Sequence, residues 1–249
     1  MILYEGISSF DTAPIVVIAT GYDTVSKNPK TGQMVQTWIM RSDINPFEAV
    51  KKGYDASVCS DCPQRWFKGG GCYVNPGYAP LNVFKKYKKG GYSKLYSLQD
   101  ISDFGKDRNI RIGSYGDPGA VPLKVWEALA LNARMYTGYT HAWRALRGPG
   151  WRKLFMASID RSYDVPVANL LGWRSFRTGD TRQRSEMTCP ASKEAGKKLT
   201  CMDCKACDGT NANGLTGKNV VINVHGMKSK HAKIENSPVE DLFLPYLIG

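Results

Sequence analysis

Seven cysteines in two groups constrain this chain more than any other feature. The first cysteine group lies in VCSDCPQRWFKGGGCY and the second in TCPASKEAGKKLTCMDCKACDG; their members are Cys59, Cys62 and Cys72, and Cys189, Cys201, Cys204 and Cys207. No cysteine lies outside them. The chain opens with no basic, apolar and small-residue sequence of the kind that directs export, so we expect reduced thiols. Metal binding is then the favoured explanation for such regular spacing.

The second cysteine group has enough ligands for a closed metal site. CxxCxxC with one distant cysteine supplies four thiolates, which suffices for tetrahedral zinc or for a [4Fe-4S] cluster. A zinc site usually pairs one CxxC with a second CxxC or with two histidines, whereas a compact triplet is familiar from ferredoxin-type clusters. We therefore predict a metal site here and favour iron–sulfur over zinc.

The first cysteine group has only three thiolates. A structural zinc ion would need a fourth ligand, which the fold would have to bring from His141, His225 or His231. A four-iron cluster held by three thiolates instead keeps one iron open to a small molecule. The division into three and four thus predicts one [4Fe-4S] cluster with an open iron and one fully ligated cluster, with zinc as the alternative.

Composition and charge limit the class of protein. Hydrophobic residues make up 42% of the 249 residues, which is enough for a sizeable core. The longest apolar run, at 14–19, is far too short to cross a membrane, and we expect a soluble protein with no membrane partner. The net charge of +12 leaves open a nucleic acid or another polyanion as partner. The basic residues gather in four clusters: Lys85, Lys86, Lys88 and Lys89; Arg144, Arg147, Arg152 and Lys153; Arg174, Arg177, Arg182 and Arg184; and Lys228, Lys230 and Lys233.

Turn residues and apolar periodicity predict the organisation of the N-terminal part. We expect a hairpin with strands at 13–20 and 34–40, then a short helix at 46–52 with Asn45 as its N-cap. A helix is expected at 80–89, directly after the first cysteine group, because its apolar residues share one face and Gly90 and Gly91 follow it.

Strands and helices alternate in the rest of the chain, which favours parallel βα units. Strands are expected at 109–115, 135–139, 153–159, 172–177 and 219–225, and helices at 121–134, 142–147 and 163–171. We predict a single α/β domain over 1–249, with an N-terminal hairpin. It takes the form of a complete or partial TIM-type barrel, or of an open doubly wound sheet, with cysteine-rich metal-binding loops inserted at 55–80 and 186–210.

Polar residues follow several of the expected strands. In parallel α/β barrels the active site gathers at the carboxyl ends of the strands. The residues at these positions are Asp117, Thr140, His141, Asp160, Arg161, Arg177 and His225. Among them, Asp117, His141 and Asp160 are the catalytic candidates.

A three-cysteine loop that leads into a helix and then into repeated βα units resembles the radical S-adenosylmethionine (SAM) superfamily. The layout is also similar to poorly characterised phage-encoded proteins of radical-SAM-like type, in which a Tyr follows the last cysteine of the loop, as Tyr73 follows Cys72 here. The intervals between the cysteines differ from the usual CxxxCxxC loop, and Gly116, Asp117 and Pro118 stand where a GGE-like segment is expected.

The resemblance implies that the first cysteine group holds a cluster whose open iron binds the amino and carboxylate groups of SAM and cleaves it reductively to a 5′-deoxyadenosyl radical. It implies that the second group holds an auxiliary cluster and that the segment 111–118 contacts SAM, with Tyr73, Gly116 and Asp117 as cofactor contacts. We expect action on a nucleic acid or nucleotide, and a cytoplasmic location, in the host cell if the chain is phage-encoded.

Two alternatives remain open. One is a zinc-stabilised nucleic-acid-binding protein without catalysis, in which aromatic residues near basic ones stack on bases. For each of these rings core packing is the favoured role; they are Trp66, Tyr87, Trp143, Trp151 and Trp173. The other is a barrel similar to the tRNA-guanine transglycosylases, with Asp117 or Asp160 as nucleophile. Its single zinc would be held by Cys201, Cys204 and Cys207 with His225 or His231.

Overall fold

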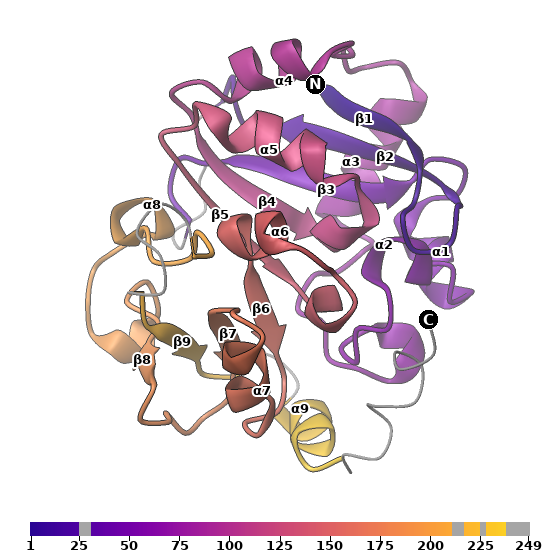
Figure 1. The fold of residues 1–249 in the computed structure, drawn as a ribbon. Coiled ribbons are helices and arrows are strands. Elements are labelled where there is room, and N and C mark those ends of the chain that lie inside the picture. Colours follow the sequence, from indigo (N-terminus) through magenta and orange to yellow (C-terminus); the bar gives the residue numbers. More distant parts are fainter. Residues whose placement is uncertain (25–30, 211–216, 225–227, 238–249) are drawn as a thin grey trace.

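The computed structural model describes residues 1–24, 31–210, 217–224 and 228–237. Its strands form one sheet in the order β1-β2-β3-β4-β5-β6-β7-β9-β8 (Figure 1). Pairing is antiparallel from β1 to β3 and parallel from β3 onward. The strands are β1 (Ile2–Ile7), β2 (Pro14–Thr20), β3 (Val35–Arg41), β4 (Asn109–Tyr115), β5 (Met135–Thr140), β6 (Met156–Ile159), β7 (Ser175–Thr178), β8 (Glu186–Thr188) and β9 (Asn219–Ile222).

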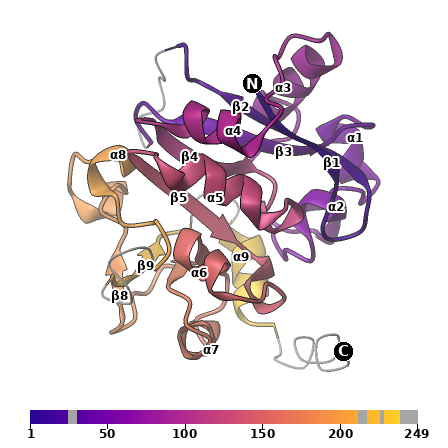
Figure 2. The same ribbon diagram turned by 45° about the horizontal axis from the view of Figure 1, so that its top comes forward.

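Helices cover the sheet and connect its parallel strands (Figures 1 and 2). The α-helices are α1 (Pro46–Lys51), α2 (Ala56–Cys59), α3 (Ala79–Lys88), α4 (Leu98–Gly105), α5 (Leu123–Leu131), α6 (Pro149–Leu154), α7 (Asp164–Leu170), α8 (Cys201–Cys204) and α9 (Lys228–Glu235). Single 3₁₀ turns are η1 (Trp66–Lys68), η2 (Pro118–Ala120), η3 (Ala142–Arg144) and η4 (Lys193–Ala195).

Strand β2 is buried on both faces, which explains its uninterrupted apolar sequence. Ile15 and Val17 face a core built with α4 and α5, whereas Val16 and Ile18 face a second core built with α3. Because successive side chains of a strand point to opposite faces, a strand between two helical layers needs apolar residues at every position. In Figure 2, α4 and α5 lie side by side on one face, with α3 on the other side of the strands.

Several local expectations are confirmed. The hairpin of β2 and β3 is antiparallel, and β4 spans the predicted residues. Asn45 caps α1, because its Oδ1 accepts a hydrogen bond from the Glu48 backbone N–H at 3.0 Å. The helix expected after the first cysteine group is α3, which ends shortly before Gly90.

The mixed α/β class with a largely parallel sheet is confirmed, and the sheet is open. Its two edges, β1 and β8, do not pair with one another among the described strands, so these strands form no complete barrel. The helix expected at 142–147 is a single 3₁₀ turn, η3, and the strand expected from 153 begins only at Met156, because Pro149 starts the short helix α6. The second cysteine loop contributes the edge strand β8.

Two further expectations concern the C-terminal region. Strand β9 ends at Ile222, and His225 lies outside the described residues. Helix α9 packs beside the start of α7, where the Arg161 Nε donates to the Ile234 carbonyl and the Ser162 backbone N–H donates to Glu235 (Figure 1). Within the described ranges, no helix combines the length and the apolar character needed to cross a membrane.

Candidate functional site

All seven cysteines line a single cavity of ≈ 430 Å³, which we call the cysteine cavity. None of them forms a disulfide. The cavity lies at the carboxyl ends of the parallel strands, because its walls include Asp117 after β4, His141 after β5 and Asp160 after β6. Two cysteine groups that are more than a hundred residues apart in sequence therefore open into the same space.

The first cysteine group is held by a buried ion pair at its base. Arg65 contacts both carboxylate oxygens of Asp55, with Nε–Oδ2 at 2.9 Å and Nη2–Oδ1 at 2.6 Å. The same guanidinium donates to the carbonyls of Gly53 and Ser60. This bidentate geometry fixes the turn that follows Cys59 at the end of α2.

Backbone hydrogen bonds close the rest of this loop. The Cys72 N–H donates to the Gln64 carbonyl at 2.9 Å, and the Trp66 indole donates to the Cys72 carbonyl at 2.8 Å. Gly70 allows the close approach that this closure needs, since a Cβ there would lie 2.3 Å from the Gln64 carbonyl carbon. The start of the loop is docked on the turn after β4 through the Asp117 N–H, which donates to the Val58 carbonyl at 2.6 Å.

The three thiols of the first group are close enough to influence one another. Burial raises the pKa of the Cys59 thiol well above its usual value, and the neighbouring Cys62 and Cys72 raise it further. Burial also raises the pKa of Cys72 to about 11, although a hydrogen bond from the Val74 backbone opposes this. The Cys59 and Cys72 thiols therefore stay protonated until a metal displaces the proton.

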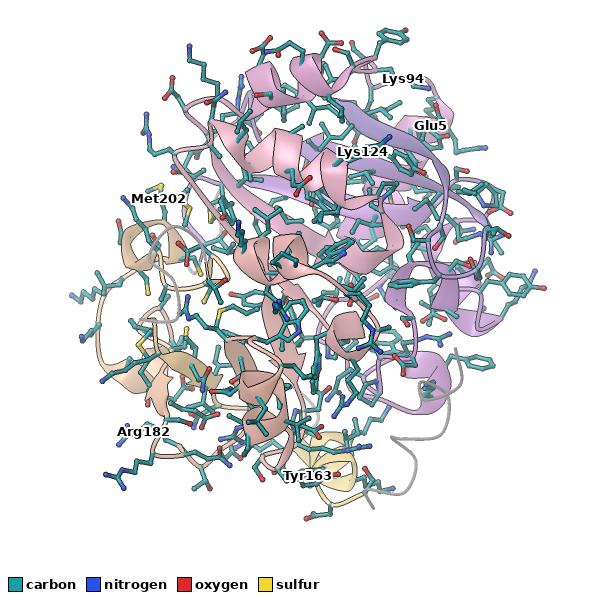
Figure 3. The ribbon with its side chains drawn as sticks, viewed as in Figure 1. Glu5, Lys94, Lys124, Tyr163, Arg182 and Met202 are labelled. Carbon is teal, nitrogen blue, oxygen red and sulfur yellow. The ribbon has the colours of Figure 1, made fainter. Side chains whose placement is uncertain are left out.

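The four thiols of the second cysteine group also lie close to one another. Burial raises the pKa of Cys207 to about 12, although a hydrogen bond from Tyr139 lowers it. The other thiols of the group raise it further; they are those of Cys189, Cys201 and Cys204. Two of the four are the end residues of α8, whose Thr200 and Asp203 form a capping box. Figure 3 labels Met202, which lies between them in this helix.

Arg174 fastens the segment that carries Cys207. Its guanidinium donates to the carbonyls of Gly209 at 2.5 Å, Ala206 at 2.7 Å and Lys218 at 2.9 Å. A planar fork that satisfies several carbonyls holds an irregular loop in one conformation. Glu186 of β8 is anchored in the same region by Arg177, whose Nε lies 2.7 Å from Oε1.

The catalytic candidates from the sequence are brought together. His141 Nε2 lies 3.1 Å from Asp160 Oδ2, and Gln64 Nε2 donates to Asp160 Oδ1 at 2.9 Å. Asp117 accepts hydrogen bonds from the Thr140 hydroxyl at 2.7 Å and from the His141 backbone N–H at 2.7 Å. The polar residues at the ends of three successive strands therefore form one connected network.

His141 links this network to the first cysteine group, because its ring is hydrogen-bonded to the Cys62 thiol. Burial disfavours the charged ring, but Cys62 and Asp160 outweigh burial and hold the pKa of His141 well above its usual value. Burial alone would raise the pKa of Asp160, whereas the charge of His141 and the hydrogen bonds from His141 and Gln64 hold it below its usual value. For Asp117 burial prevails, and its pKa is raised.

The expected cofactor contacts also line the cysteine cavity: Tyr73, Gly116 and Asp117. Gly116 has φ +80, and a Cβ there would lie 2.5 Å from the Ile39 carbonyl oxygen, so this turn requires glycine. Of the histidines considered as zinc ligands, His231 lies with its Nε2 3.9 Å from Asp160 Oδ1.

Sequence reasoning did not single out Gln64 or Tyr139 of the cavity wall, and it placed Arg111 only within the segment expected to contact SAM. Gln64 could have been found from its place within the first cysteine loop. Arg111 and Tyr139 lie in the middle or near the end of strands, where only the register of the sheet reveals which way they face.

The structure corrects the interpretation of one basic cluster. Arg174 and Arg177 are buried, with 6% and 2% of their surface exposed, and both hold loops of the protein rather than facing a polyanion. Trp143 and Trp173 are each 2% exposed, which confirms their favoured role in core packing.

Comparison with known proteins adds no relative. No family model matches the chain, and neither a curated protein nor a solved structure matches it. Within the described residues, no group of three or more His, Cys, Asp and Glu side chains is arranged to hold a metal ion. The geometry of the cysteine cavity therefore carries the functional argument.

Proposed function

We propose that the chain is an iron–sulfur protein of radical-SAM-like type. The first cysteine group would hold a [4Fe-4S] cluster with an open iron, and the second a fully ligated auxiliary cluster. The open, largely parallel sheet would correspond to a partial TIM-type barrel. The observation that carries this proposal is that a trio and a quartet of unbridged thiols line the same cavity.

The donor set supports clusters at both places. Thiolates are the usual ligands of iron–sulfur clusters, and all seven thiols here are free of disulfides. The buried Arg65–Asp55 pair holds the first group, and Arg174 holds the second. When bound, a cluster at the first group would supply an electron to SAM.

The residues of this chain would position SAM. The turn after β4 would contact SAM, since Gly116 and Asp117 line the cavity and the Asp117 carboxylate is fixed by its donors. Tyr73 follows the last cysteine of the trio and lines the same cavity. The cavity volume of ≈ 430 Å³ lies in the range of small-molecule sites.

Reciprocal cysteine variants test the proposal. Cys72→Ala should abolish SAM cleavage and lower the iron content per chain by about half, while the visible absorbance of the second cluster remains. Cys204→Ala should remove the second cluster and spare SAM binding, so that each variant is the control of the other. Equal loss of iron from both sites in either variant, or SAM cleavage that survives Cys72→Ala, would contradict the proposal.

A second candidate function follows from the hydrogen bond between His141 and Cys62. Histidine ligands of metals commonly contact a carboxylate through the ring nitrogen that does not bind the metal; here Nε2 of His141 contacts Asp160, so Nδ1 would be the ligand atom. The first group would then be a Cys₃His zinc site without SAM chemistry. Under this alternative, purified protein contains zinc without acid-labile sulfide, and His141→Ala lowers its zinc content.

A further inference from the structure

Arg111 has no role in the proposed clusters, yet it lines the cysteine cavity from the middle of β4. Its Nη2 donates to the Tyr73 hydroxyl oxygen at 2.5 Å. Its other neighbours are Tyr139 and Cys201, and the influence of Tyr73 raises its pKa. Arg111 therefore lies between Tyr73, which follows the first cysteine group, and Cys201 of the second.

The charge of Arg111 is not neutralised by a carboxylate. The buried arginines that hold the two cysteine loops pair with acids: Arg65 with Asp55, Arg174 with Asp208 and Arg177 with Glu186. No ion pair of the described residues includes Arg111. A partly buried guanidinium without a counter-ion favours the entry of an anion.

The acids of the cavity are already engaged. Asp160 is paired with His141, and Asp117 accepts hydrogen bonds from the Thr140 hydroxyl and the His141 N–H. Neither carboxylate is therefore free to neutralise Arg111. Because the Tyr73 oxygen accepts from Arg111, its own O–H remains able to donate, so the two residues can present donors to one oxyanion.

We propose that Arg111 and Tyr73 form a binding subsite for the phosphate or carboxylate of a small anionic substrate. Tyr73 directly follows Cys72 of the first cysteine group, whereas Arg111 also neighbours Tyr139 and Cys201, so the subsite lies between the two cysteine groups. The assignment to a second substrate rests on that proposed function; the anion subsite itself does not. The substrate would lie in the cavity between the two cysteine groups.

Binding of inorganic phosphate to the full chain, prepared anaerobically, tests the subsite by ³¹P NMR titration. Arg111→Gln should weaken phosphate binding about ten- to a hundredfold, because it removes a hydrogen bond between charged groups. Tyr73→Phe should weaken binding less and leaves the charge in place. Arg147→Gln is the matched control, since it removes the same charge from an exposed residue outside the cavity.

Acetate replaces phosphate in a parallel titration and distinguishes a carboxylate from a phosphate ligand. Circular dichroism checks that each variant is folded. If Arg111→Gln does not fold, the comparison of Tyr73→Phe with wild type tests the subsite instead. The subsite would be overturned if the cavity variants bound both phosphate and acetate as tightly as wild type does. It would also be overturned if Arg147→Gln lost as much binding as Arg111→Gln.

Titration in the presence of saturating SAM separates the two proposals. If phosphate still binds when SAM is saturating, the subsite belongs to a second substrate. If SAM displaces phosphate, the assignment of the subsite to a second substrate is overturned. Failure of the proposed function is seen independently, as protein that binds phosphate at Arg111 but contains no iron or labile sulfide.

Discussion

Arg65 and Asp55 form a bidentate, buried ion pair, with 7% and 3% of their side chains exposed. The pair joins the residue before α2 to the middle of the first cysteine loop. Its position means that the loop carrying Cys62 and Cys72 is fixed by a charge pair rather than by an apolar core. This relationship makes the first site sensitive to substitutions that never touch a cysteine.

Arg65→Gln should lower the free energy of unfolding by about 3–5 kcal/mol, because it leaves the Asp55 carboxylate buried without its partner. Urea denaturation measures the change. The exposed pair of Lys51 and Glu48 provides the control, and Glu48→Gln should cost less than about 1 kcal/mol. Similar losses in both variants would show that the buried pair has no special role.

Gly70→Ala should disrupt the first cysteine loop, since the added Cβ would lie 2.4 Å from the Pro63 carbonyl oxygen. A backbone contact of this kind cannot be relieved by a rotamer change, and we expect a cost of about 1–3 kcal/mol or more together with loss of metal from the first group. Gly77→Ala is the control, because its nearest atom is the flexible Asn75 side chain at 3.2 Å. Unchanged metal content in Gly70→Ala would contradict the described loop.

Arg174→Lys should release the segment around Cys207. Lysine keeps the charge but lacks the fork that reaches the Gly209, Ala206 and Lys218 carbonyls. Iron per chain should fall from about eight to about four, with SAM binding retained. The exposed Arg184→Lys should leave the iron content unchanged. Loss of the first cluster in Arg174→Lys would contradict the separation of the two sites.

Glu5 provides a pH dependence away from the cysteines. Hydrogen bonds from Tyr87 and Lys94 lower its pKa below the usual 4.5, and Figure 3 labels Glu5 and Lys94 on the same side of the molecule. A carboxylate whose folded pKa is depressed stabilises the fold above pH 4.5 and loses this contribution as the pH falls through the folded value. Glu5→Gln should therefore be less stable than wild type at neutral pH by up to about 1 kcal/mol, since the pair is partly exposed.

Urea midpoints at neutral and acidic pH check this expectation. The difference between wild type and Glu5→Gln should shrink towards zero below the folded pKa. A difference that grows on acidification would mean that Glu5 is stabilising in its protonated form.

Local sequence signals predicted much of the fold, because they act over a few residues. Asn45 before Pro46 marks the start of α1, and the alternation of strands and helices indicated the parallel sheet. Helix α4 was missed, although Ser97 and Asp100 carry its capping box. The three residues of β8 carry too little pattern to be recognised, since their strand is defined by pairing with β9.

The site could be predicted in its parts but not in its assembly. Spacing predicted two cysteine groups and the pattern of polar residues after strands singled out Asp117, His141 and Asp160, and all of these residues line the cavity. That both cysteine groups open into one cavity depends on how β4 to β9 are ordered in space, which no local pattern contains. For the same reason Arg174 and Arg177 resembled a basic surface in the sequence, although tertiary contacts bury both.

Iron and acid-labile sulfide per chain, determined together with zinc on anaerobically prepared protein, test the central claim most directly. Two cube-type clusters predict about eight irons and about eight sulfides per chain. Stoichiometric zinc without labile sulfide would contradict the claim that these two groups of thiols hold iron–sulfur clusters.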